Sequence, residues 1–161
     1  GAVCRGFNYR MTEIHGAIGL AQLKKLDMII ESQRANKAKL ITGLSELDVP
    51  FRNSLDPDGD ISDTIVFYMP NRETTDKFVA AMRVKGLGTK NLPDAIRWHF
   101  SKHWSHMLSD HPIYGNRLDT AWSKSADILE CSVALPVGVK MDDSRISEIV
   151  SKILNIGKTV L

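Results

Sequence analysis

Apolar residues recur every three or four positions between residues 11 and 47, which is the period of one face of a helix. Thr12 is a suitable N-cap, and Glu13 lies in the first turn, where the helix dipole favours an anion. Gly16 and Gly19 lie in the first turns, and glycine costs up to about 1 kcal/mol inside a helix. We therefore expect another element to approach these turns closely. A helix over this whole range is too long for a small domain to cover, so it predicts a bridge to another domain or chain.

The remainder of the chain alternates between strand-like and helix-like segments. We expect strands at residues 64–69, 87–91 and 131–135, and helices at residues 72–85, 94–108, 116–129 and 143–156. Asn71 and Asp142 are suitable N-caps, and Gly86 suits the position just after a helix end. The last strand alternates apolar and polar residues, which predicts one exposed face. Helices that cover a sheet of about three strands make a two-layer α+β domain.

Composition narrows the class of protein. The chain has 161 residues, 43% of them hydrophobic, which suits one domain or one domain with an appendage. Lys plus Arg is 21 against 19 Asp plus Glu, and this balance predicts neither a nucleic-acid nor a membrane partner. No apolar run approaches the length of a membrane span. Two cysteines, Cys4 and Cys131, and an N-terminus without a signal peptide favour the cytoplasm.

Histidines supply the first candidate chemistry. His99, His103 and His106 are spaced to share one face of a helix. Three imidazoles on one face can bind zinc, although their spacing matches no established zinc motif. The alternative is that they line a surface or a substrate cleft. A non-catalytic binding module with a metal on this face therefore remains a second hypothesis for function.

Asn8, Tyr9 and Arg10 form a polar, aromatic and cationic cluster just before the first helix. Arginine pairs in bidentate fashion with phosphate or carboxylate, and asparagine adds an amide donor. The cluster indicates an anion site, or otherwise an ordinary loop before a helix.

Two consecutive stretches are specific enough to indicate a family. They are residues 6–14, Gly-Phe-Asn-Tyr-Arg-Met-Thr-Glu-Ile, and residues 17–27, Ala-Ile-Gly-Leu-Ala-Gln-Leu-Lys-Lys-Leu-Asp. Together they strongly resemble the DegT/DnrJ/EryC1/StrS family of sugar aminotransferases, which have fold type I and use pyridoxal 5′-phosphate. Residues 135–137, Leu-Pro-Val, are similar to the end of a late strand in that family. The resemblance covers nearly the whole chain, but only the C-terminal half of a typical member.

The resemblance implies a division of the chain. Residues 1–47 would be an active-site loop and a long interdomain helix, and residues 48–161 the small C-terminal α+β domain of a fold-type I enzyme. The family's Schiff-base lysine lies upstream of the Asn-Tyr-Arg motif. Lys24 and Lys25 lie inside the helix motif and do not correspond to it. The chain would then be a piece of a longer protein, without catalytic residues and inactive by itself.

The resemblance also implies site residues. Asn8 and Arg10 would be cofactor-binding residues in a homodimer with shared active sites. Asn8 would reach the cofactor phosphate of the neighbouring subunit, and Arg10 would lie at the same site, near the phosphate or the anionic substrate. Tyr9, His99 and His103 would contact the substrate. Glutamate would donate the amino group to a keto or aldehydo sugar, either nucleotide-linked or a sugar acid, for surface polysaccharide or lipopolysaccharide. The stretch 91–99 is similar to aminotransferases that make 8-amino-octulosonate.

Overall fold

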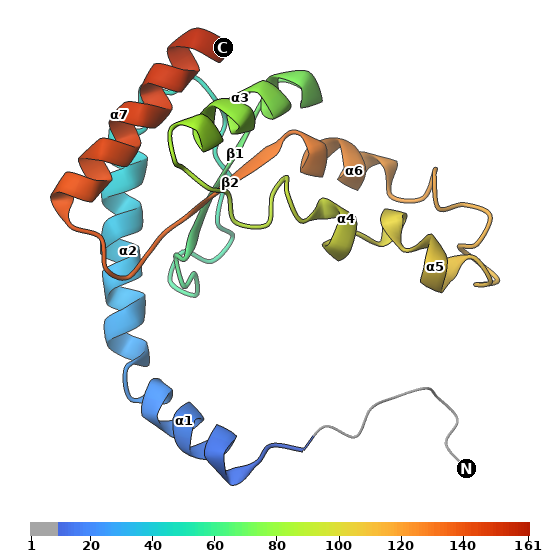
Figure 1. The fold of residues 1–161 in the computed structure, drawn as a ribbon, viewed down its shortest axis with the longest axis horizontal. Coiled ribbons are helices and arrows are strands. Elements are labelled where there is room, and N and C mark those ends of the chain that lie inside the picture. Colours follow the sequence, from blue (N-terminus) through green and yellow to red (C-terminus); the bar gives the residue numbers. More distant parts are fainter. Residues whose placement is uncertain (1–9) are drawn as a thin grey trace.

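The computed structural model describes residues 10–161 (Figure 1). Asn8 and Tyr9 lie outside the described residues. The helices are α1 (Glu13–Leu23), α2 (Leu26–Gly43), α3 (Arg72–Val84), α4 (Ile96–His99), α5 (Ser105–Leu108), α6 (Ser123–Glu130) and α7 (Asp143–Val160). A 3-10 turn, η1 (Ser101–His103), separates α4 from α5, and the strands are β1 (Thr64–Tyr68) and β2 (Ser132–Pro136).

The sheet is an antiparallel pair in which Thr64 lies opposite Pro136 and Tyr68 opposite Ser132. The predicted strand at 87–91 does not form, so the expectation of about three strands is corrected to two. The Lys90 N–H still donates to the Ala134 carbonyl of β2. Asn91, however, has a φ of +70°, which turns the chain out of the extended conformation before a ladder can develop.

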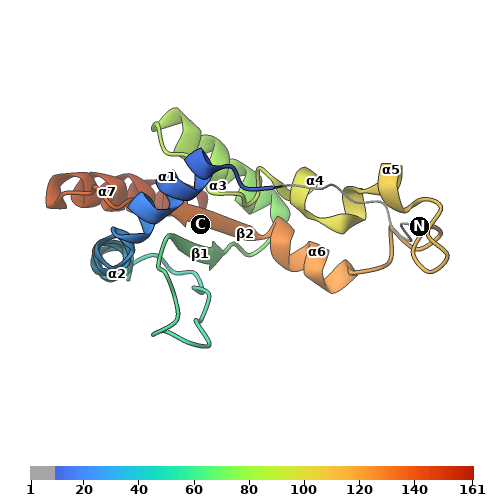
Figure 2. The ribbon, with the colours of Figure 1, turned by 90° about the horizontal axis from the view of Figure 1, so that it is seen from below.

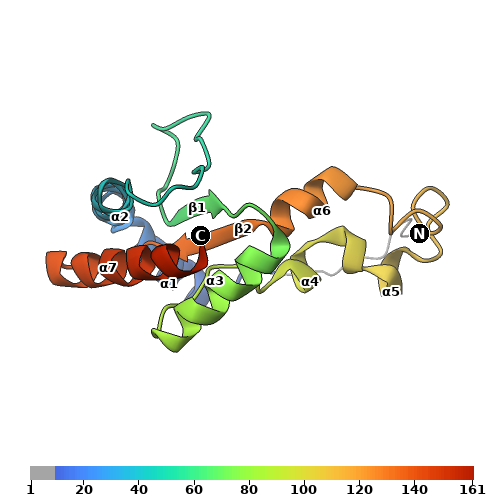
Figure 3. The same ribbon diagram turned by 90° about the horizontal axis from the view of Figure 1, so that it is seen from above.

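Three helices bury the sheet. The helix α3 packs against β2 and α7, and α2 packs against β1 and α7. The rings of Phe67 and Phe78 meet edge to face at 5.8 Å in the centre of this core. The expectation that β2 has an exposed face is wrong, because Ser132 through Leu135 are all buried. Figure 3 shows α7 and α3 on one side of the strands.

The first predicted helix is divided into α1 and α2 by a turn at Lys24 and Lys25. The C-terminal half of α2 belongs to the core through Leu40, and Leu44 just after the helix is also buried there, whereas α1 buries none of its residues. Nothing in the described part of the chain lies within 4 Å of a Cβ built on Gly19. The close approach expected from its glycines is therefore not made by these residues.

The predicted caps are confirmed. Thr12, Asn71 and Asp142 each accept a backbone N–H of the first turn of α1, α3 and α7, respectively. Gly86 has a φ of +74° just after α3, a conformation that glycine adopts without strain. These boundaries follow from local sequence alone.

Residues 93–130, which we call the arm, extend from the sheet on the side opposite α2 (Figures 1 and 2). The single helix predicted over 94–108 is instead α4, η1 and α5. The helix predicted from residue 116 begins only at Ser123, because Trp122 has a φ of +63° that an α-helix does not permit. In the described part of the chain, no helix is both long and apolar enough to cross a membrane.

Candidate functional site

Arg10 is the predicted cofactor contact that the structure describes, and it is exposed just ahead of α1. The first turn of α1 is closed by Thr12, whose hydroxyl oxygen accepts the N–H of His15 at 3.3 Å. The positive end of the helix dipole and the guanidinium of Arg10 thus lie close together in the chain. This combination suits a phosphate group.

His99 lines a small hollow of about 130 Å³ where the arm joins the sheet. The other lining residues are Asn91, Leu92, Ala95, Ile96, Phe100 and Leu129. Apart from Asn91 and His99 these are apolar. The hollow therefore favours a small, mostly apolar group that carries one polar atom for a hydrogen bond with the imidazole of His99.

His103 lines a second hollow, of about 280 Å³, which shares Ile96 with the first. Its other lining residues are Arg72, Asp76, Pro93, Asp94 and Glu130. The guanidinium of Arg72 lies 3.8 Å from Asp76 and 3.7 Å from Glu130, so these charges are largely paired with one another. The two substrate histidines predicted from the sequence thus lie in neighbouring hollows of different character.

The prediction that His99, His103 and His106 share one helix face is wrong. The chain is extended at Phe100, with φ −111° and ψ 123°, so the three histidines lie on three separate short turns. Among residues 10–161, no three His, Cys, Asp or Glu side chains gather in a way that could hold a metal ion.

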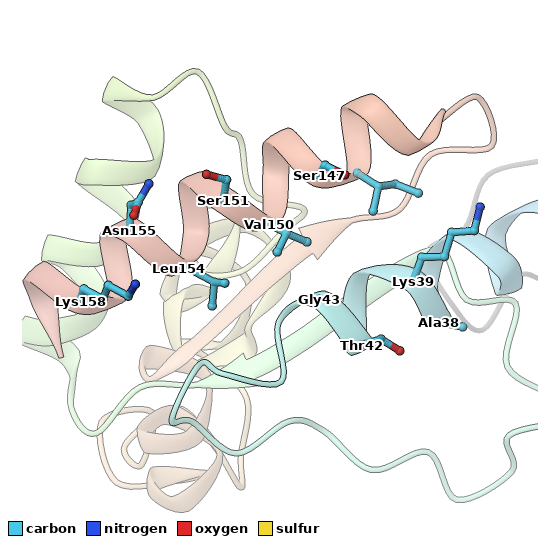
Figure 4. A pocket seen from close by; sticks show the side chains of 11 residues that line it. Ala38, Lys39, Thr42, Gly43, Ser147, Val150, Ser151, Leu154, Asn155 and Lys158 are labelled. Atoms are coloured by element: carbon cyan, nitrogen blue, oxygen red, sulfur yellow. The ribbon is translucent and has the colours of Figure 1, made fainter.

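A third hollow, larger than the two beside the histidines, was not predicted from the sequence. It is an open groove of about 750 Å³ between α2 and α7, and Figure 4 shows side chains from both helices along it. A Cβ built on Gly43 would lie 2.7 Å from Cγ2 of Val150, so the two helices are unusually close there. The signal in the sequence was the row Ser147, Ser151 and Asn155 on the outer face of α7. Nothing in the described residues connects this groove to Arg10, His99 or His103.

Polar residues of α2 hold two loops in place. Asn36 donates to the carbonyl oxygen of Gly138 at 2.9 Å, and Lys37 pairs with Asp60 at 2.6 Å. The hydrogen bond from Lys37 holds the pKa of Asp60 below its usual value, and the N–H of Ser62 adds to the effect. These residues arrange the loops around the sheet and form no hollow with the histidines.

The model of the DegT/DnrJ/EryC1/StrS aminotransferase family matches residues 2–154. The chain belongs to this family. Solved sugar aminotransferases have the same fold over this length. Spr1654 of Streptococcus pneumoniae in its PMP form has a TM-score of 0.69 at 14% identity, covering 99% of this chain and 38% of the other. PseC of Helicobacter pylori, involved in pseudoaminic acid biosynthesis, has a TM-score of 0.69 at 14% identity, with coverage of 99% and 41%.

CalS13 of Micromonospora echinospora reaches 20% identity at a TM-score of 0.66, covering 93% of this chain and 37% of its own. The chain thus spans about two fifths of the length of the solved DegT/DnrJ/EryC1/StrS aminotransferases that it matches. Identities this low establish a shared fold. The structural matches place the two-stranded sheet and its helices within part of a sugar aminotransferase fold.

Enzymes of the DegT/DnrJ/EryC1/StrS family depend on pyridoxal 5′-phosphate, and Spr1654 has been solved in PLP and PMP forms. Arg10 fits the phosphate of that cofactor by its charge and its exposure. A Schiff base also needs a lysine in a cavity that encloses the ring. Lys24 and Lys25 are exposed on the turn between α1 and α2 and do not meet that need. The described residues therefore fit a contact to the phosphate, not the whole cofactor site.

Proposed function

We propose that this chain is the C-terminal portion of a PLP-dependent aminotransferase that moves an amino group from glutamate to a keto or aldehydo sugar. The family match over residues 2–154, which includes the Asn-Tyr-Arg motif, carries the proposal. We further propose a sugar destined for surface polysaccharide or lipopolysaccharide. An 8-amino-octulosonate-type product is the specific candidate, because of the stretch 91–99.

Within that reaction, the cofactor supplies an electron sink for moving the amino group. Arg10 contributes positive charge and Asn8 an amide donor at the cofactor phosphate, and these contacts hold the cofactor without taking part in proton transfer. His99 and His103, with Tyr9, bind and orient the sugar. The Schiff-base lysine belongs to a preceding segment, so residues 1–161 alone do not transaminate.

The exposed apolar surface of α1 supports a shared site in a homodimer, which we propose is cytoplasmic. Ile14, Leu20 and Leu23 are 72%, 64% and 63% exposed, respectively, although large apolar side chains on a helix normally pack against another element. We propose that residues 1–47 are the active-site loop and the interdomain segment, and that residues 48–161 are the small domain. An interdomain segment is covered by other parts of the enzyme. The rest of the enzyme or the second subunit would therefore cover the apolar surface of α1.

The proposal is tested by visible absorption of the full-length gene product. We expect a cofactor band as purified that changes when glutamate is added, and recovery of the original band when the correct sugar is added. Arg10→Ala should weaken PLP binding by about tenfold or more, because a charge-assisted contact to the phosphate is lost. Arg10→Lys should retain part of the affinity.

A protein without a band, even after incubation with PLP, would contradict the proposed function. Unchanged PLP affinity in Arg10→Ala would contradict only the assignment of Arg10.

A further inference from the structure

The end of α4 is closed by the side chain of Trp104, a residue that lies between η1 and α5. The last carbonyl groups of a helix have no partner in the helix itself. In a continuous α-helix the Trp98 carbonyl would accept an N–H four residues later, but the extended backbone at Phe100 removes that geometry. Instead, the indole Nε1–H of Trp104 donates to the Trp98 carbonyl oxygen at 2.9 Å.

The backbone of Trp104 also joins the two later turns of the arm. Its N–H donates to the carbonyl of Ser101 at 3.0 Å and so closes η1. Its carbonyl accepts the N–H groups of Met107 and Leu108, each at 2.9 Å, and so begins α5. One residue thereby contacts α4, η1 and α5.

The two histidines lie on the turns that Trp104 connects. His99 is the last residue of α4, and His103 is the last residue of η1. The imidazole of His103 meets the ring of Phe100 edge to face at 6.2 Å, and Ile96 separates the two hollows. The angle between α4 and η1 therefore sets the separation of the two imidazoles.

We infer that Trp104 is a positioning residue, whose indole N–H fixes the placement of His99 relative to His103 and thereby sets affinity for the sugar acceptor. This inference rests on the proposed function, in which both histidines contact the sugar. Trp104 itself is half-buried and lines neither hollow. Its effect would thus reach the substrate only through the histidines.

The test is steady-state kinetics of the full-length enzyme carrying Trp104→Phe, which removes the N–H and keeps an aromatic ring. We expect the KM for the sugar to rise about fivefold, the size expected for one neutral hydrogen bond, with kcat changed less than about twofold. The half-reaction with glutamate should be unchanged. Tyr114→Phe is the matched control, because it removes an aromatic hydroxyl from the same arm outside α4, η1 and α5, and its KM should equal that of the wild type.

A purely structural role would lower the melting temperature and the active fraction, reducing apparent kcat at constant KM, and would overturn the inference. His99→Ala and His103→Ala are measured in parallel. If both raise KM and Trp104→Phe does not, the positioning role fails while the proposed site stands. If neither raises KM, the sugar site is misassigned and the inference falls with it.

If Trp104→Phe does not fold, the role of Trp104 can still be tested on the wild-type enzyme. Hydrogen exchange of the Trp104 indole N–H, followed by NMR, should slow when the sugar binds. An unchanged exchange rate would overturn the inference.

Discussion

Asp60 makes local contacts through both its carboxylate and its backbone carbonyl. It pairs with Lys37 at 2.6 Å and accepts the N–H of Ser62 at 2.8 Å, and Arg34 donates to its backbone carbonyl at 3.1 Å. Both Lys37 and Asp60 expose less than a fifth of their side chains. Solvent therefore screens this pair less than it screens a surface ion pair.

The pH dependence of stability follows from these contacts. The pKa of Asp60 is lower in the folded protein than its usual value of 3.8, chiefly because of the hydrogen bond from Lys37. A carboxyl of this kind stabilises the fold at any pH above its ordinary pKa. The stabilisation is lost as the pH falls through the lower, folded-state pKa.

We predict that Asp60→Asn lowers the free energy of unfolding by about 1 kcal/mol at pH 7 and by much less near pH 2. Urea denaturation at the two pH values measures the difference. Glu148→Gln is the control, since Glu148 pairs with Arg145 and Lys152 on the surface, and it should cost less at pH 7. An equal loss for Asp60→Asn at both pH values would contradict the ion-pair explanation.

At the scale of elements, α2 and α7 pack through a position where only glycine fits. The Cβ of any other residue at 43 would lie 2.7 Å from Val150 Cγ2, and valine is stiff at χ1. Gly19 in α1 has no such neighbour in the described part of the chain. Gly43 therefore lets two helices approach closely, whereas Gly19 makes no such contact with the described residues.

We predict that Gly43→Ala lowers the free energy of unfolding by about 1–3 kcal/mol, because the added methyl group forces α2 and α7 apart. Val150→Ala in the same protein should recover part of the loss. Gly19→Ala, by contrast, should leave stability unchanged or raise it by up to about 1 kcal/mol, since alanine is the better helix former. Thermal unfolding of the three variants measures these changes in stability. Equal losses of stability for Gly43→Ala and Gly19→Ala would contradict the close packing of α2 and α7.

At the scale of the whole molecule, the described residues form a core with two appendages, the arm and α1. The arm lies on one side of the sheet, and α1 continues from α2 away from it (Figure 1). Arg10, just before α1, and the histidines of the arm share no hollow formed by the described residues. We propose that they act in sites completed by the rest of the enzyme and by a second subunit.

Complementation tests that arrangement. With PLP held well below its Kd for Arg10→Ala, this full-length variant and a full-length variant lacking the Schiff-base lysine should each be nearly inactive. Mixed and reassembled, they should recover about one quarter of wild-type activity, because half of randomly assembled two-fold dimers hold one intact site. Assay of the reassembled mixture measures this recovery, and the purified mixed dimer should reach about one half of wild-type activity. No recovery in verified mixed dimers would mean that Arg10 serves its own subunit's cofactor.

The sequence by itself determined the local features of this protein. Helix caps at Asn71 and Asp142 and the turn at Gly86 depend on residues only a few positions apart, so they could be predicted. The family motif near Arg10 could also be recognised from consecutive residues. Its site assignments remain predictions.

Only the tertiary structure decided what depends on distant segments. The break at Phe100, which separates His99 from His103, and the later break at Trp122 follow from how the arm leaves the sheet and not from its apolar spacing. The burial of β2 on both faces and the groove beside Gly43 likewise need α3 and α7 in place. Periodicity reports the face a residue occupies within its own element, whereas long-range packing determines where elements end and which of them meet.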